Sequence, residues 1–420
     1  MKKLLMIAFH FPPLAISSGI QRTISFARHL PRFGWEPMIL TAHPRVYERV
    51  SDDQLMDLPS DTKVKRAFAL DTSRHFAVMG RYPASAARPD RWITWWLGAV
   101  PAGLSMIRQY RPHAIWSTYP IATAHKIGHT LHQLSGVPWI ADFRDPMAQD
   151  GYPADPKTWQ SFQKIEQRAL HRASFSVLAT PGAARMYRER YPDVPDSCVV
   201  EIANGYDEEN FARLDDSSEN MGPLIPGTFT LVHSGIVYPS ERDPTQLFQA
   251  LRLMLDEGRL KPGELRVRLR APAHETILAR LIGDFRLTDV IELAPPIPYR
   301  SALQEMMRAD GLLVLQAANC NDQIPAKVYE YLRCRRPIIA LTDPKGDTAG
   351  VLSQAGIDNI ARLDSVQEIV LELSRFLDQV RRGQIARPSD AFVRAASRLE
   401  RTRELANLLE QLPARPHVTS

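Results

Sequence analysis

The chain has 420 residues, of which 24% are charged, and a formal net charge of +5 at pH 7. This length is too great for one compact core and predicts two domains, while the composition is that of an ordinary globular protein. The small, scattered excess of arginine argues against a nucleic-acid-binding protein and favours anionic partners such as phosphates or a lipid surface.

Cysteine usage and the apolar runs predict a cytoplasmic protein without a membrane span. The three cysteines, Cys198, Cys320 and Cys334, are far apart and odd in number, so they form neither a disulfide framework nor a zinc motif. The apolar run of residues 4–9 is too short for a signal peptide and is followed by no cleavage site, so we expect a first strand there. The longest apolar run, which begins at Ile93, is interrupted by glycine and proline and is too short to span a bilayer.

Short apolar runs alternate with helical patterns in the first half of the chain. The predicted strands are residues 4–9, 36–42, 113–118, 137–143, 175–180 and 199–204. The predicted helices are residues 20–33, 92–109 with an interruption at Pro101, 122–134 and 158–172. Continuous apolar strands that alternate with helices predict a parallel sheet covered on both faces.

A polar segment rich in glycine, proline and serine, residues 212–228, is typical of a linker, and the alternation restarts after it. The further strands are residues 229–235, 265–271, 290–295, 311–317 and 336–341, with helices that begin near Pro244, His274, Tyr299 and Ala326. A last helical pattern runs from Asp390 to about Leu412 and is followed by a polar tail.

The predicted fold is therefore α/β, with two doubly wound Rossmann-like domains that face each other across a cleft. We expect them at residues 1–210 and 211–388, with residues 389–420 as a C-terminal helix that packs back on the first domain, and a tail. In such sheets ligands bind outside the carboxyl ends of the strands.

The stretch IPAKVYEYL, residues 324–332, has the features of a helix start that binds an anion. Pro325 suits the first turn, where its missing N–H costs nothing, and the helix N-terminus offers free N–H groups to a diphosphate. Lys327 adds positive charge, and the Glu330 carboxylate on the same face suits two adjacent hydroxyls, as on a ribose. Asp322 lies in the preceding loop, where it suits sugar hydroxyls. The alternative is a Lys327–Glu330 pair on a solvated helix.

Two loops at strand ends are further candidates for phosphate binding. Gly19 opens a helix after the first strand, although the loop lacks the dinucleotide and P-loop glycine patterns, so an ordinary turn is the alternative. Arg242 follows the strand that ends at Gly235, and arginine binds phosphate in a bidentate manner. The alternative for Arg242 is an ion pair with Asp243 or Glu241.

Polar residues also follow two strands of the first half. In WIADFRDPM we favour a structural role for Asp142 and Arg144, and leave Asp145 open between a substrate contact and an ion pair with Arg144. His125, with His129 and His132, forms a stripe at helical spacing, but no carboxylate completes a metal set, so a metal site is disfavoured. His125 alone, close after a strand end, is placed to face the cleft.

Together these stretches resemble the retaining glycosyltransferases of family 4, which have the GT-B fold. Asp322, seven further residues and Glu330 resemble the E-x7-E signature of that family, and IPAKVYEYL with RPIIAL is similar to its nucleotide-sugar helix and the following strand. FPPLAISSGIQRTISFARHLPRFGWEPMILT resembles the start of its acceptor domain, NGYDEENF its interdomain turn, and HSGIVYPSERDPTQLFQAL the start of its donor domain. The resemblance covers nearly the whole chain.

The resemblance implies roles for individual residues. Glu330 would hold the donor ribose, and Asp322, in place of the usual glutamate, would contact the donor sugar. Arg242 would bind the diphosphate together with a lysine, for which Lys327 is our candidate because Thr245 and Gln246 stand near the usual position. His125 would be the histidine that contacts the donor sugar, and Asp145 is a candidate on the acceptor side. The complete donor-binding set would be Gly19, Gly235, Arg242, Asp322, Gln323, Ile324, Lys327, Val328 and Glu330.

The implied activity is retaining, metal-independent sugar transfer from a nucleotide-diphosphate sugar to a glycan or lipid-linked acceptor, with no cofactor besides the donor, in surface polysaccharide synthesis. The leaving diphosphate would be stabilised by arginine, lysine and helix N–H groups. The protein would be cytoplasmic, either free or in peripheral contact with the inner membrane face through Trp92, Trp95 and Trp96, for which core packing is the favoured alternative. A sugar-nucleotide 2-epimerase and a non-catalytic nucleotide-sugar-binding protein remain alternatives.

Overall fold

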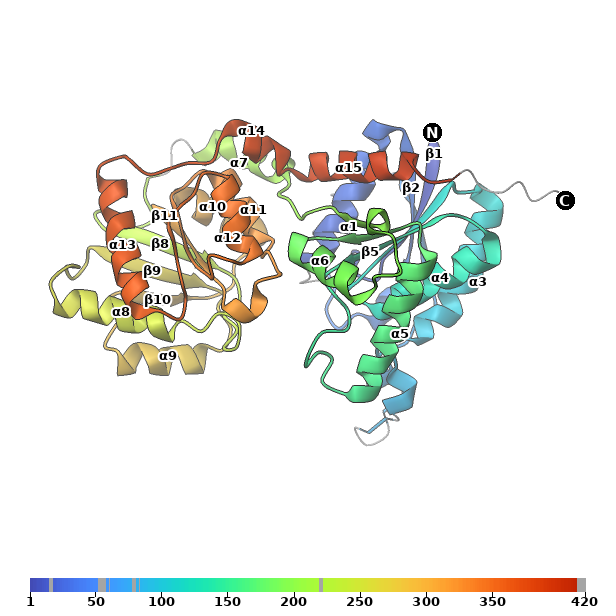
Figure 1. Ribbon diagram of the computed structural model, residues 1–420, viewed down its shortest axis with the longest axis horizontal. Coiled ribbons are helices and arrows are strands. Elements are labelled where there is room, and N and C mark those ends of the chain that lie inside the picture. The colour runs from blue at the N-terminus through green and yellow to red at the C-terminus, as the bar shows by residue number, and fades with distance from the viewer. Residues whose placement is uncertain are drawn as a thin grey trace. The chain divides into compact units, whose positions relative to one another are not determined.

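The computed structural model describes residues 1–14, 18–51, 58–59, 61–77, 81–82, 84–218 and 222–413. They form two compact units, which we call unit 1 and unit 2 (Figure 1). Unit 1 comprises Met1–Asn204 and the segment from Arg398 onward, and unit 2 comprises Gly205–Ser397. The first boundary lies six residues before the expected one at 210, and the second lies nine residues after the expected one at 388.

Unit 1 is built on a seven-stranded sheet in the order β3-β2-β1-β4-β5-β6-β7, with every neighbouring pair parallel. The strands are β1 (Lys2–Ile7), β2 (Trp35–Ala42), β3 (Lys63–Ala67), β4 (Ala114–Thr118), β5 (Trp139–Arg144), β6 (Phe175–Leu178) and β7 (Val199–Glu201). The order reverses between β1 and β4, and the crevice outside their carboxyl ends is where such sheets bind ligands.

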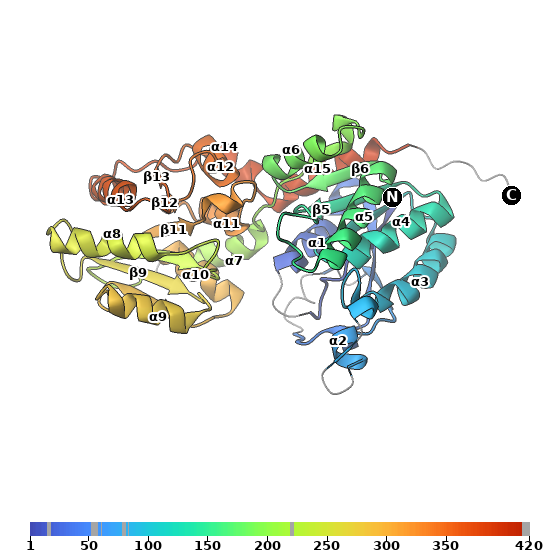
Figure 2. The ribbon, with the colours of Figure 1, turned by 60° about the horizontal axis from the view of Figure 1, so that its bottom comes forward.

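Helices cover both faces of this sheet. They are α1 (Ser18–His29), α2 (Thr72–His75), α3 (Thr94–Tyr110), α4 (Ala122–Ser135), α5 (Pro156–Arg172), α6 (Pro181–Arg190) and α15 (Arg398–Glu410), with short 3-10 helices at Leu30–Phe33, Pro44–Val46, Ala84–Ala87 and Asp196–Cys198. Figure 2 shows α3, α4 and α5 side by side, and Figure 1 shows α15 beside α1 although they are far apart in sequence.

Side chains that alternate along β1 supply two cores, one on each face of the sheet. Leu5 and Ile7 join a cluster with residues of α3, α4, α5 and α6, whereas Leu4 and Met6 join one with residues of α1 and α15. This alternation is the period of two expected of a strand, and because both sides are apolar the strand is a continuous apolar run.

Unit 2 repeats the design with six parallel strands in the order β10-β9-β8-β11-β12-β13. The strands are β8 (Phe229–Ser234), β9 (Leu265–Arg270), β10 (Ile291–Ala294), β11 (Gly311–Leu315), β12 (Ile338–Leu341) and β13 (Ile360–Ala361). The helices are α7 (Glu208–Ser218), α8 (Thr245–Asp256), α9 (Glu275–Asp284), α10 (Tyr299–Arg308), α11 (Lys327–Cys334), α12 (Asp347–Gln354), α13 (Val366–Arg381) and α14 (Asp390–Ala395), with a 3-10 helix at Ala318–Cys320. The order reverses between β8 and β11.

Three sequence-based expectations about elements are corrected. The first part of the expected linker is helical, because α7 extends to Ser218 and buries Phe211 and Leu214; residues 219–221 lie outside the described part of the chain. Pro101 does not interrupt α3, since it lies on an exposed side of the helix where water can satisfy the carbonyl group that its missing N–H leaves. The last helical pattern is two helices, α14 and α15, rather than one.

Candidate functional site

The loop after β8 approaches the start of α11 at the carboxyl edge of the unit 2 sheet. Gly235 has φ of 124°, and a Cβ at this position would lie 2.5 Å from Lys327 Nζ. Glycine adopts this backbone conformation without the strain that a side chain would cause, and it leaves room for the lysine amine. The amine of Lys327 therefore lies directly over the backbone of the strand end.

The side chain of His233 contacts that amine and helps to position it. The fully buried imidazole lies with Nδ1 2.9 Å from the carbonyl oxygen of Leu313, so Nδ1 carries the hydrogen and donates it. Nε2 is then an acceptor, and it lies 3.4 Å from Lys327 Nζ. Burial, and then the charge of Lys327, hold the pKa of His233 well below its usual value, so the ring is neutral.

The position of Lys327 is costly for a positive charge. Burial, followed by repulsion from Arg242, lowers the pKa of Lys327 to about 7, although Glu330 acts in the opposite direction. Arg242 donates from Nη1 to the carbonyl oxygen of Ile236 at 2.6 Å, and its guanidinium carbon lies 5.4 Å from the ring centre of Tyr238. Two cationic groups thus converge on one strand end, where an anion would relieve their repulsion.

Glu330 lies half-buried one turn along α11 from Lys327. The hydroxyl of Tyr299, at the start of α10, donates to Glu330 Oε1 at 2.7 Å. This bond fixes one carboxylate oxygen. No side chain caps the N-terminus of α11, which begins directly after Pro325 and Ala326.

The loop that carries Asp322, Gln323 and Ile324 is held by two side chains. Gln316 Nε2 donates to the carbonyl oxygens of Cys320 and Gln323 at 2.6 and 2.9 Å. Thr348 Oγ1 donates to Gln316 Oε1 at 2.5 Å and lies 3.0 Å from the carbonyl oxygen of Gln323. Asp322, Gln323 and Ile324 are all half-buried, and Val328 is buried behind them in the core.

The remaining expected site residues lie in unit 1. Gly19 is the second residue of α1, and its carbonyl oxygen accepts a hydrogen bond from Arg144 Nη2 at 2.9 Å. Arg144 Nη1 also donates to the carbonyl oxygen of Tyr119 at 3.2 Å, so this arginine links two backbone segments rather than pairing with Asp145. Asp145 is exposed at the carboxyl end of β5.

His125 is placed inside the core of unit 1, which corrects the expectation that it faces a cleft. The side chain is fully buried, Nδ1 lies 2.8 Å from Ser117 Oγ, and the ring centre is 4.6 Å from that of Phe143. Burial lowers its pKa to about 3. A neutral imidazole with no exposed surface does not reach a substrate, so we withdraw the expectation that His125 contacts the donor sugar.

A buried ion pair joins α1 to the end of β5, and sequence reasoning missed half of it. Arg22 donates from Nε and Nη2 to the two carboxylate oxygens of Asp142 at 3.0 and 2.9 Å, and Thr118 Oγ1 donates to the same carboxylate at 3.0 Å. Arg22 also donates to the carbonyl oxygens of Ile202 and Ala203. An aspartate in an otherwise apolar strand was the available signal, because a buried carboxylate needs a cationic partner.

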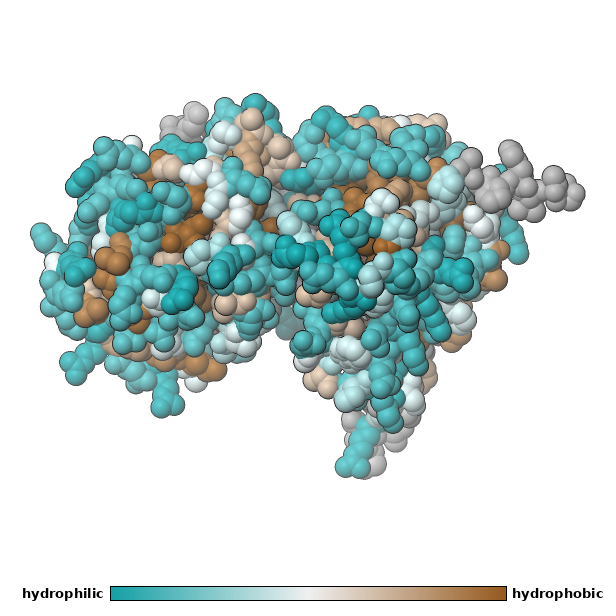
Figure 3. Space-filling view, in the orientation of Figure 1, coloured by the Kyte–Doolittle hydropathy of each residue, from teal (hydrophilic) through white to brown (hydrophobic). Residues whose placement is uncertain are grey.

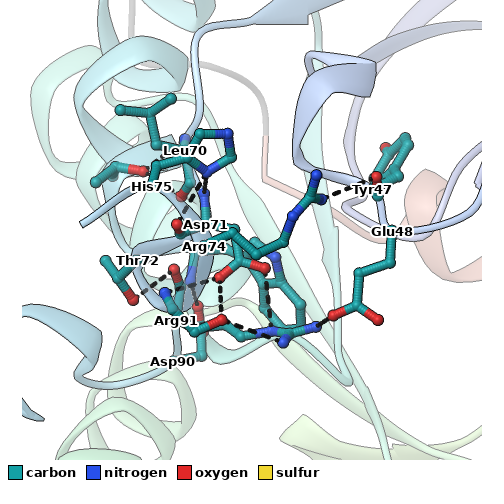
Figure 4. A network of polar contacts seen from close by, with 12 residues as sticks. Tyr47, Glu48, Leu70, Asp71, Thr72, Arg74, His75, Asp90 and Arg91 are labelled. Carbon is teal, nitrogen blue, oxygen red and sulfur yellow. Dashed lines mark hydrogen bonds and ion pairs between the residues drawn. The ribbon is translucent and has the colours of Figure 1, made fainter. Parts of the chain in front are cut away.

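A second polar network fixes three loops at the same edge of unit 1 (Figure 4). Arg91, just before α3, donates to Glu48 at 2.5 Å and lies 3.5 Å from Asp71, whose side chain caps α2. Arg74 of α2 in turn donates to the carbonyl oxygen of Tyr47 at 3.1 Å. The loops that follow β2 and β3 are thereby tied to the start of α3.

The structure also bears on metals and membranes. Among the described residues, no group of three or more histidine, cysteine or acidic side chains is arranged to hold a metal ion. No helix in the described ranges is both long and apolar enough to cross a bilayer. Trp95 is fully buried, and Trp92 and Trp96 pack against the same core, as the core interpretation predicted.

Comparisons with known proteins identify the fold. Sucrose-phosphate synthase from Thermosynechococcus elongatus matches with a TM-score of 0.66 at 12% identity, over 98% of this chain and 99% of that one. The chain has the GT-B fold. Anabaena HepE in complex with UDP and glucose matches with a TM-score of 0.66 at 13% identity, over 98% and 100% of the two chains. E. coli trehalose-6-phosphate synthase bound to UDP-2-fluoro glucose matches with a TM-score of 0.63 at 11% identity, over 99% and 100%. No protein-family model and no curated protein matches the sequence.

Proposed function

We propose that this GT-B protein is a retaining, metal-independent glycosyltransferase of the family 4 type, which moves a sugar from a nucleotide-diphosphate sugar to a glycan or lipid-linked acceptor. The observation that carries the proposal is that Lys327 and Arg242 converge at the end of β8. Glu330 lies one helical turn along α11 from Lys327. A diphosphate would neutralise the two cations, and a ribose would hydrogen-bond to the carboxylate.

The chemistry follows from this arrangement. As the glycosidic bond to the donor breaks, negative charge develops on the diphosphate, and preorganised cations stabilise it there. When the nucleotide diphosphate leaves, the face of the sugar to which it was bound becomes accessible. Attack by an acceptor hydroxyl from that same face retains the configuration, with the leaving phosphate taking the proton.

The acceptor is proposed to bind unit 1 at the edge fixed by the Arg91 network, where Asp145 is exposed. For a lipid-linked acceptor, the protein would work in the cytoplasm in peripheral contact with the inner membrane face. HepE was solved with UDP, so uridine nucleotides are the first donors to test.

The proposal is tested by a thermal-shift panel of UDP, GDP and ADP and their sugars. A ligand that binds only the native state raises the melting temperature by mass action. We expect one nucleotide series to raise it, and a transfer or donor-hydrolysis assay with that series to release the nucleotide. Absence of a shift with every nucleotide would overturn the donor site, and an epimerised nucleotide sugar would replace the transferase by a 2-epimerase. Binding without turnover would point to a non-catalytic protein.

Replacing Glu330 with glutamine is expected to weaken nucleotide-sugar binding about 10-fold or more, because hydrogen bonds to a charged group contribute about 1.5–3 kcal/mol. Tyr299→Phe should weaken nucleotide-sugar binding less, because it removes only the hydroxyl that orients the carboxylate. Glu275→Gln, at an exposed position in the first turn of α9, is the matched control. Calorimetric titration with the donor measures all three, and an unchanged affinity in Glu330→Gln would rule out the ribose contact.

Donor affinity is expected to fall as the pH rises above about 7. Lys327 is charged below its pKa, which is about 7 in the free protein, and a diphosphate would raise that pKa by favouring the ammonium form. The groups that face it are His233, which burial keeps neutral, the guanidinium of Arg242 and the carboxylate of Glu330. Lys327→Arg should bind the nucleotide sugar with little pH dependence, since guanidinium does not titrate here. If calorimetric titration showed that the donor affinity of the unmodified protein does not change with pH, this assignment would be contradicted.

A further inference from the structure

A groove of about 660 Å³ lies between α4 and α5, apart from every residue proposed above to bind a substrate. Its lining includes Lys126, His129 and Thr130 of α4 and Arg168, His171 and Arg172 of α5. None of its lining residues, all within the described ranges, is acidic. We call it the basic groove; the two helices lie side by side in Figures 1 and 2, and the surface over them is hydrophilic in Figure 3.

The two arginines of the basic groove lack compensating negative charge. Arg168 and Arg172 are four residues apart on one helix face, where like charges repel each other. Within the described part of the chain, neither forms an ion pair, in contrast to Arg190, which pairs with the buried Glu166. Burial and then the charge of Arg168 lower the pKa of both Lys126 and His129.

The groove is also built rather than loosely lined. Trp96 Nε1 of α3 donates to Thr130 Oγ1 at 3.0 Å, and Lys126 Nζ lies 5.1 Å from the centre of the Trp96 ring. His171 is held at the other side by Asp193 and by the carbonyl oxygen of Gln167. Lys126 and His171 are therefore held at the two sides of one concave space.

We propose that the basic groove binds a phosphate group, carried by a membrane lipid headgroup or by a free phosphate compound. Two guanidinium groups and an ammonium group around a small space suit a compact anion with several oxygens, and arginine binds phosphate oxygens in a bidentate manner. The proposal stands independently of sugar transfer, because no residue of the groove belongs to the donor site.

The test uses inorganic phosphate and the NMR signal of the His129 imidazole, assigned with His129→Gln. An anion at the groove is expected to raise the pKa of His129 by about 1, the size of effect that a nearby opposite charge produces. Arg168→Gln/Arg172→Gln should abolish this response. Arg108→Gln/Lys157→Gln removes two exposed positive charges outside the groove and should leave it intact. No response of His129 in the unmodified protein, or an equal loss in both double variants, would overturn the site.

Vesicles separate the two sources of phosphate. The protein and both double variants are sedimented with phosphatidylcholine vesicles that do or do not contain phosphatidylglycerol. Selective loss of binding in Arg168→Gln/Arg172→Gln assigns the groove to a lipid headgroup. A His129 response to inorganic phosphate with no difference between vesicles assigns it to a free phosphate compound. If both double variants lose vesicle binding equally and His129 does not respond, only net charge acts and the proposal fails.

Discussion

Replacing Asp142 with alanine is expected to lower the free energy of unfolding of unit 1 by about 3–5 kcal/mol, the cost of leaving a buried charge without its partner. Arg22 is 5% exposed and directs two nitrogens at the carboxylate, so removal of Asp142 leaves the guanidinium with two backbone carbonyls and without the carboxylate that it binds directly. The same carboxylate accepts from Thr118, which would also lose its partner. We expect the destabilisation to arise where α1, β4 and β5 meet, because Arg22, Thr118 and Asp142 lie on these elements.

The measurement can be confined to unit 1. All seven tryptophans lie between residues 35 and 159, so tryptophan fluorescence during urea denaturation reports on this unit alone. Glu36→Ala is the matched control, because it breaks an ion pair with Lys63 that is partly exposed to solvent. Exposed pairs contribute about 0–1 kcal/mol, so this variant should unfold almost as the unmodified protein does. Equal effects of the two substitutions would show that burial of the Arg22–Asp142 pair is not decisive.

Replacing Lys327 with methionine is expected to weaken donor binding about 10- to 100-fold, since a charged hydrogen bond to phosphate contributes about 1.5–3 kcal/mol. Methionine keeps most of the length of the side chain and removes the ammonium that lies over Gly235. The stability of the free protein should not fall, because the lowered pKa of Lys327 means that its charge is unfavourable there without a ligand. This combination separates a binding role from a structural one.

Lys345→Met is the control for this substitution. Lys345 is exposed after β12, at the same edge of the sheet, but outside the proposed donor set. Calorimetric titration with the nucleotide sugar and thermal melting of the free proteins give the two readouts. An unchanged affinity in Lys327→Met would refute its contact with the diphosphate. A large drop in melting temperature would instead make it a structural residue.

The sequence determined the architecture because its signal is local. Apolar runs such as residues 137–143 and 338–341 are buried on both sides in a parallel sheet, so their composition alone predicts them. The helix start was visible to within two residues, because Pro325 directly precedes Ala326 and Lys327, where α11 begins. The edge strand β3, with the sequence KVKRA, lacks that signal since most of its side chains are exposed.

What the sequence could not determine is which polar residues meet. His125 matched the expected position of a sugar-contacting histidine but lies in the core. Packing alone decides which face of α4 turns toward the sheet. Arg22 and Asp142 are 120 residues apart in the chain, and His233 and Lys327 are 94 apart, yet each pair is in contact. Spacing along a chain determines which residues share a helix face or a strand edge, whereas distances between elements follow from how their apolar faces pack. Residues expected to take part in the chemistry could therefore be proposed from the sequence. The neighbouring groups that orient them and shift their pKa values could be identified only in the tertiary structure.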